Sequence, residues 1–114
     1  MIQVLHIIAA IATIATGLYA LVRPRAVTPF TGLQATGPRG ITEIRAVLGG
    51  FFVGLGIAPL LCNSADMYLM LGLAYLVVAV VRAASILLDK SWTRSNIISL
   101  AVEVVLGMVL LIPA

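Results

Sequence analysis

The sequence contains few charged residues for a protein of its length. Of its 114 residues, 10% are Asp, Glu, Lys or Arg, whereas 62% are hydrophobic, and the mean hydropathy is +1.20. A soluble domain carries a far more charged surface, with about a quarter of its residues charged. The composition therefore excludes an ordinary soluble domain and favours an integral membrane protein.

Cysteine and histidine each occur once, as Cys62 and His6. A single cysteine excludes an internal disulfide and a cysteine-based metal cluster. A single histidine cannot supply a zinc centre, a di-iron site or bis-histidine haem ligation, so we predict no cofactor. Cys62 is interpreted as a small apolar residue near a helix end. His6 is interpreted as a hydrogen-bonded histidine near the membrane interface, with ligation of a pigment or haem from a partner chain as the alternative.

The sequence also lacks motifs that would place it in a known class of enzyme. It has no Gly-rich phosphate loop, no nucleophile elbow and no Ser-His-Asp set. The net charge is +3, but no stripe of basic residues alternates with aromatics, so nucleic-acid binding is not predicted. The N-terminus has no basic segment before its apolar run, which indicates a first membrane span rather than a cleavable signal peptide.

Four long apolar runs occupy most of the chain. A membrane-spanning helix needs about 20 predominantly apolar residues, and the runs cover residues 2–22, 41–61, 67–88 and 97–112. Proline, glycine and charged residues separate them, and the loop 23–40 is long for a helical hairpin. We predict an all-α integral membrane four-helix bundle with up-down topology, in a single transmembrane domain over residues 1–114. Ser95 or Asn96 is expected to cap the fourth helix.

The basic residues of the loops lie on one predicted side of the membrane. Arg23, Arg25 and Arg39 lie in loop 23–40, and Lys90 and Arg94 lie between the third and fourth spans. The two termini and the remaining loop contain no Lys or Arg. Because cytoplasmic loops are enriched in Lys and Arg, we predict that both termini face away from the cytoplasm.

Small residues recur at helical spacing on two faces of the second span. The first face contains a GxxxG motif and consists of Ala46, Gly50, Gly54 and Ala58. The second face consists of Arg45, Gly49, Phe52 and Gly56. Small residues let membrane helices approach closely. Packing within the bundle is the first interpretation, and contact with a partner protein or with a second copy of the chain is the alternative.

Several polar side chains are predicted within the membrane or at its edge. A charge at the centre of a membrane helix costs about 2.5 to 3.5 kcal/mol on insertion scales, so each one calls for a partner or a function. The helical rise of about 1.5 Å per residue places the deepest of them in one layer near the basic loops. This predicted intramembrane polar cluster consists of Glu43, Arg45, Arg82, Ser85, Asp89 and Glu103.

The order of these residues predicts which of them meet. Arg82, Ser85 and Asp89 lie on one stripe of the third span. We expect Arg82 to pair with Glu103, and Arg45 to pair with Asp89 or Glu103. Such pairs would fix the helix register, or they would form a polar site for a ligand, a proton or a lipid headgroup. The residues alone leave both interpretations open.

Three separated motifs resemble a bacterial family of small four-helix membrane proteins that is catalogued as a domain of unknown function. Residues 42–56, with Glu-Ile-Arg-Ala followed by Gly-Gly, resemble its signature. The pattern Arg-x-x-Ser-x-x-x-Asp at residues 82–89 and the final-helix Glu103 match its later motifs, whereas Lys90 stands where glycine is expected. More loosely, the architecture is similar to DoxX-like proteins. The resemblance implies a four-helix fold in the bacterial cytoplasmic (inner) membrane and no established activity.

These observations favour a non-enzymatic integral membrane protein that is an accessory or scaffold subunit of a membrane complex. Its expected partners are membrane lipids and either another membrane protein or further copies of the chain. The alternative is a binder or carrier of a small lipophilic or anionic molecule at the layer of Arg45, Arg82 and Glu103. An enzyme that uses Glu43 or Glu103 as acid or base is a third hypothesis, although nothing in the sequence positions a substrate.

Overall fold

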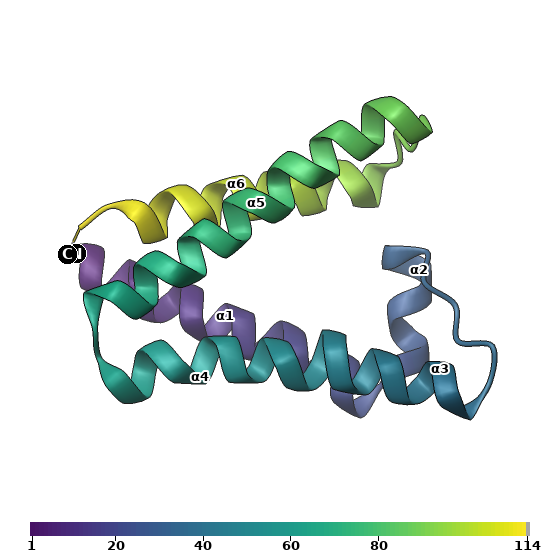
Figure 1. The fold of residues 1–114 in the computed structure, drawn as a ribbon, viewed down its shortest axis with the longest axis horizontal. Helices are drawn as coiled ribbons and strands as arrows, with labels where there is room; N and C mark the ends of the chain where they lie inside the picture. The colour runs from purple at the N-terminus through teal and green to yellow at the C-terminus, as the bar shows by residue number, and fades with distance from the viewer. Residues whose placement is uncertain (114) are drawn as a thin grey trace. The chain divides into compact units, whose positions relative to one another are not determined.

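The computed structural model describes residues 1–113, and most of them are helical (Figure 1). The elements in chain order are α1 (Ile2–Val22), η1 (Pro24–Val27), α2 (Thr28–Thr31), α3 (Pro38–Glu43), η2 (Ile44–Phe51), α4 (Phe52–Cys62), α5 (Ala65–Asp89) and α6 (Arg94–Leu111). Because α3, η2 and α4 follow one another without a break, they form one span, Pro38–Cys62. Four helical segments in the described residues are therefore long and apolar enough to cross a membrane, which confirms the predicted all-α membrane fold class.

The helices begin where local chemistry satisfies their first backbone N–H groups. The second span begins at Pro38, because proline suits the first position of a helix. Ser64 caps α5 by accepting a hydrogen bond from the Asp66 N–H at 3.2 Å. Thr93 caps α6 by accepting from the Asn96 N–H at 3.2 Å. The expectation that Ser95 or Asn96 caps this helix is therefore wrong, because the extended backbone needed at a cap occurs at Thr93.

Two helices end on non-glycine residues in the left-handed conformation. These residues are Asn63 after α4, with φ 45°, and Lys90 after α5, with φ 54°. The Lys90 N–H donates to the Ile86 carbonyl, which closes the end of α5. Glycine adopts this conformation without the penalty of about 1–2 kcal/mol that a Cβ atom brings. The turn at Lys90 thus keeps the geometry that glycine would favour, at a modest conformational penalty.

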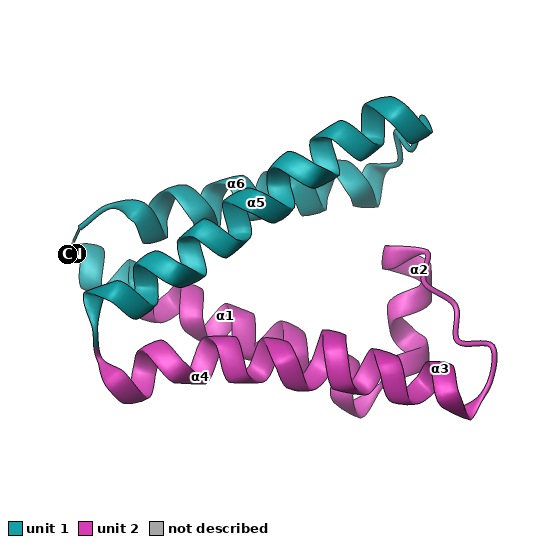
Figure 2. Ribbon diagram, viewed as in Figure 1, with its two compact units in different colours: residues 1–6, 64–114 teal, residues 7–63 magenta. Residues whose placement is uncertain are grey.

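Contacts divide the chain into two compact units (Figure 2). Unit 1 contains Met1–His6 and the chain from Ser64 onward, and in it α5 packs along α6. Unit 2 contains Ile7–Asn63, which holds most of α1 and the whole second span. The single transmembrane domain expected from the sequence stays a prediction.

In unit 2, α1 and the second span approach until their backbones touch. A Cβ atom added to Gly17 would lie 2.6 Å from the Gly49 carbonyl oxygen and 2.8 Å from the Val53 nitrogen. A Cβ added to Gly56 would lie 2.6 Å from the Ala10 carbonyl oxygen. Since real Cβ atoms do not come this close to backbone, only glycine permits this helix spacing at these positions.

The two small-residue faces of the second span therefore have different neighbours. The face with Gly49 and Gly56 packs against α1. On the other face, a Cβ added to Gly54 would meet no atom within 4 Å, and one added to Gly50 would meet only the Arg45 carbonyl oxygen, at 3.7 Å. The GxxxG motif at Gly50 and Gly54 is thus not the motif that joins the helices of unit 2.

Part of the second span is a π-helix rather than the α-helix that the sequence predicted. The π-helix η2 covers Ile44–Phe51 and contains both Arg45 and Gly49. Its i→i+5 hydrogen bonding is rare; it occurs mostly as single turns inside α-helices, frequently at functional sites. Apolar patterning does not distinguish this hydrogen-bonding pattern in a run that is apolar on most faces, so the π-helix could not be predicted from it.

In unit 1, glycines again allow close packing, here of α5 against α6. A Cβ added to Gly107 would lie 2.5 Å from the Leu76 Cδ2 atom. One added to Gly72 would lie 2.8 Å from the Leu110 Cβ atom. The clashing atoms here include side chains, so this interface has more freedom to adjust than the backbone contact in unit 2.

His6 links the first turns of α1 to the end of α6 within unit 1. Its side chain is buried, its Nε2 atom donates to the Val109 carbonyl oxygen at 3.1 Å, and its ring lies 5.0 Å from the Tyr68 ring. Val109 lies in the last turn of α6, where carbonyl groups lack helical partners. The predicted hydrogen-bonded histidine is therefore confirmed, and its partner is a helix-end carbonyl.

A matched pair of substitutions tests the backbone contact in unit 2. We expect Gly17→Ala to lower the free energy of unfolding by about 1–3 kcal/mol, because the new methyl group must displace backbone atoms. Gly54→Ala should be neutral or stabilising by up to about 1 kcal/mol, because alanine favours helix and meets no atom there. Unfolding of the purified protein in mild detergent, followed by circular dichroism, measures both, and equal effects would contradict the packing.

Candidate functional site

Arg82 and Glu103 form a two-pronged ion pair between α5 and α6. The Arg82 Nε atom donates to Glu103 Oε1 at 2.7 Å, and Nη2 donates to Oε2 at 2.7 Å. A bidentate pair of this kind is stronger and more directional than a single charged contact. The pairing predicted from the sequence is confirmed for these two residues.

Asn96 extends this pair toward the loop between α5 and α6. The Arg82 Nη1 atom donates to the Asn96 Oδ1 atom at 2.8 Å. The Asn96 Nδ2 atom in turn donates to the backbone oxygen and to the Oγ atom of Ser91, each at 3.1 Å. Sequence reasoning treated Asn96 only as a possible cap, although it precedes Glu103 by seven residues and so shares its helix face. This seven-residue spacing could have predicted that Asn96 lies on the same helix face as Glu103.

The ion pair is largely enclosed and its polar atoms are satisfied. The Glu103 side chain is 11% exposed and the Arg82 side chain 31%. No buried side-chain nitrogen or oxygen atom of residues 1–113 lacks a hydrogen-bond partner. Both oxygens of the Glu103 carboxylate already accept hydrogen bonds from the guanidinium group, so the two charges neutralise each other where they lie.

Ser85 and Asp89 form a second, shallower contact on α5. The Ser85 Oγ atom donates to the Asp89 Oδ2 atom at 2.6 Å, and Asp89 is exposed at the last position of the helix. The stripe predicted for Arg82, Ser85 and Asp89 thus carries two separate contacts. One is deep and charged, and the other lies at the helix end.

The remaining two residues of the predicted cluster lie in unit 2. Glu43 pairs with Arg39 one helical turn away, and both side chains are more than half exposed, at 54% and 79%. Arg45 follows in the first turn of η2. The predicted pairing of Arg45 with Asp89 or Glu103 would join residues of the two units, and it stays a prediction. So does the convergence of all six residues in one layer.

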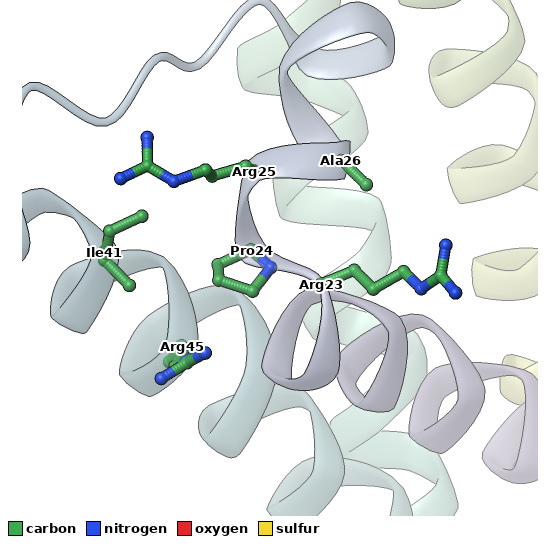
Figure 3. A pocket seen from close by; sticks show the side chains of 6 residues that line it. All are labelled: Arg23, Pro24, Arg25, Ala26, Ile41 and Arg45. Atoms are coloured by element: carbon green, nitrogen blue, oxygen red, sulfur yellow. The ribbon is translucent and has the colours of Figure 1, made fainter.

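A cationic pocket lies where α1 ends and the second span begins (Figure 3). Its volume is about 450 Å³, and it is open to the surface. Its lining consists of Arg23, Pro24, Arg25, Ala26, Ile41 and Arg45. Sequence reasoning did not place Arg23 and Arg25 beside Arg45. The pocket depends on how the turn after α1 lies beside the second span, which is a tertiary feature.

No metal site is formed by the described part of the chain. Among residues 1–113, no three His, Cys, Asp or Glu side chains come close enough together to hold a metal ion. The expectation that the protein uses no cofactor stays a prediction.

Comparison with protein-family models gives a match over nearly the whole chain. A family model described as Domain of unknown function (DUF4345) matches residues 1–113, which is nearly the whole chain. No curated protein and no solved structure matches the chain. The match agrees with the resemblance found in the three sequence motifs, and it names no activity.

The ion pair can be tested by a double-mutant cycle. Glu103→Gln should lower the free energy of unfolding by about 3–5 kcal/mol, because it leaves the Arg82 charge without a partner. Arg82→Met should cost a similar amount, and the combination of Arg82→Met with Glu103→Gln should cost less than the sum of the two single changes. Unfolding in detergent measures all of them.

Asp89→Asn is the matched control for this cycle. It also removes a carboxylate charge, but at the exposed end of α5, and it should change stability by about 1 kcal/mol or less. If Glu103→Gln were no more destabilising than Asp89→Asn, the pair would not hold α5 and α6 together.

Proposed function

Since the chain belongs to the family described as Domain of unknown function (DUF4345), which names no activity, we propose its function from geometry. The protein is a non-enzymatic integral membrane protein that acts as an accessory or scaffold subunit of a membrane complex. It docks onto a transmembrane helix of another protein through the face of the second span that holds Gly50 and Gly54.

The main support for this proposal is that Arg82 and Glu103 already bond to each other through both oxygen atoms of the Glu103 carboxylate. A general acid or base needs a carboxyl group that can exchange a proton with a substrate. Both oxygens of Glu103 are engaged by Arg82, and its side chain is only 11% exposed. Such a pair is suited to fixing the register of two helices, and it is poorly suited to chemistry.

The surfaces of the spans support a docking role. In each of the four candidate spans, at most 33% of an 18-residue apolar stretch is buried within the protein. Within unit 2, the face with Gly50 and Gly54 does not contact α1. A face of glycines allows a neighbouring helix to approach closely, which is how membrane helices associate without a hydrophobic driving force. We therefore name a transmembrane helix as the occupant of this face.

The alternative from the sequence, a binding site at the layer of Arg45, Arg82 and Glu103, has less support. Arg82 and Glu103 use their charged atoms on each other and on Asn96. Arg45 lines a pocket within unit 2 together with Arg23 and Arg25. A ligand that needs the whole layer would have to break the ion pair.

We also propose that the protein lies in the bacterial cytoplasmic membrane with both termini on the non-cytoplasmic side. The support is the placement of the loop arginines and lysine. Arg23, Arg25 and Arg39 lie between the first two spans, and Lys90 and Arg94 lie at the turn between α5 and α6. Positive charge in short loops favours the cytoplasmic side.

Native mass measurement from mild detergent tests the docking proposal. We expect the wild-type chain to carry a second, different membrane protein. Replacing both Gly50 and Gly54 with leucine should remove that protein, because the added side chains would hold its helix away. Val81→Leu is the matched control, since Val81 is 61% exposed on α5 and the change also enlarges an apolar residue.

Two results would contradict the docking proposal. One is a wild-type chain that remains a monomer or associates only with copies of itself. The other is equal loss of the partner in the glycine variant and in Val81→Leu, which would show that the Gly50 and Gly54 face is not the docking surface.

The single cysteine allows a direct test of orientation. Cys62 is exposed at the end of α4, near the turn that begins at Asn63. A membrane-impermeant maleimide should label Cys62 in right-side-out vesicles. A Ser91→Cys variant made in a Cys62→Ser background should be labelled only after the vesicles are opened. The reverse labelling pattern would show that the predicted orientation is wrong.

A further inference from the structure

Unit 2 holds more positive charge than its acidic residue can neutralise. Its charged residues are Arg23, Arg25, Arg39, Glu43 and Arg45. Glu43 is the only acidic residue between positions 7 and 63, and it pairs with Arg39. Glu43 also lines a different pocket from the one that holds Arg45. Three arginines are thus left without an acidic partner in their unit, and all three line one pocket.

The local fold brings these arginines together from distant parts of the chain. Pro24 is buried in the turn that follows α1, with Arg23 and Arg25 on either side of it in sequence. Arg45 comes from the first turn of η2. Figure 3 shows the Arg25 and Arg45 side chains on the side of Pro24 where Ile41 lies, whereas Arg23 extends the other way. Arg25 and Arg45 therefore share the side of the pocket where Ile41 lies, and Arg23 adds a third positive charge to its lining.

The pocket has the size and chemistry of a site for a phosphate group. Its volume of about 450 Å³ falls in the range of ligand pockets, roughly 300–1,000 Å³. A guanidinium group presents a planar set of donors that matches two phosphate oxygens at once. Pro24, Ala26 and Ile41 supply apolar surface for the carbon atoms next to such a group. We propose that Arg25 and Arg45, supported by Arg23, bind a phosphate-bearing anion.

The depth of Arg45 gives a physical reason for such a ligand. Arg45 lies seven residues after Pro38, the first residue of the second span, which corresponds to roughly 10 Å along the helix. An arginine without a counter-charge is unfavourable at this depth in a membrane. A bound phosphate group would neutralise it, as Glu103 neutralises Arg82 in unit 1. The phosphate group of an anionic lipid and a free phosphate ion share this chemistry.

Two binding measurements distinguish the two sources. In the first, the purified protein is incubated with phosphatidylglycerol or phosphatidylcholine, and native mass spectrometry counts the lipids that remain bound. In the second, inorganic phosphate is titrated into the protein in detergent free of anionic lipid. The variants are Arg25→Gln and Arg45→Gln. Each should weaken binding of the phosphate-bearing ligand by roughly tenfold to a hundredfold, the usual effect of losing a charged hydrogen bond.

Arg39→Gln and Arg94→Gln are the matched controls. Each removes one positive charge from the same predicted side of the membrane, but neither residue lines the pocket. Their effect should be about twofold or less, because exposed charges are screened by salt. Arg45→Lys keeps the charge and loses the planar donor set, so it should fall between Arg45→Gln and the wild type.

Each outcome of these measurements either supports or overturns the proposal. Selective retention of phosphatidylglycerol that depends on Arg25 and Arg45 supports it, with a lipid as the source. Phosphate binding with the same dependence, without lipid selectivity, supports it with a free anion as the source. Equal losses in the pocket and control variants, or no binding in either measurement, would overturn it. Circular dichroism checks folding, and if Arg45→Gln fails to fold, Arg25→Gln in the exposed turn decides.

Discussion

A membrane interior offers no water to solvate a charge, so a guanidinium group there must find its counter-charge within the protein or in a ligand. Arg82 finds it in Glu103, through two hydrogen bonds of 2.7 Å that join α5 to α6. Asn96 occupies a third donor of the same guanidinium group. This constraint fixes which faces of α5 and α6 meet, and close packing at Gly72 and Gly107 follows on the same interface.

Unit 2 differs from unit 1 in how its helices are joined and in how its charges are neutralised. Its helices are held by backbone contact at Gly17, Gly49 and Gly56, which needs no charged pair. Its one acidic residue pairs with an arginine at the exposed end of the span. The other arginines are left around an open pocket. One unit thus neutralises its deep charge internally, whereas the other presents positive charge that a ligand can neutralise. This difference separates the structural pair from the binding site proposed here.

Much of the site was predictable where it depended on one helix or on two helices joined by a short turn. The Arg82–Glu103 pair followed from depth, because both residues lie within a few turns of the same loop. Asn96 was missed, although its spacing from Glu103 places it on the same face. The face of the second span that packs against α1 was predicted only as one of two, because small residues occur on both and spacing cannot choose between them.

The sequence by itself determined the all-α class and the four membrane-crossing helices, because hydropathy and helix length are local properties of the chain. Only the tertiary structure decided that Gly49 rather than Gly54 meets α1, that Ile44–Phe51 forms a π-helix, and that Arg25 lies in one pocket with Arg45. These features depend on how two helices distant in sequence approach each other. A pattern along a single helix carries no information about the distance or the rotation of its neighbour.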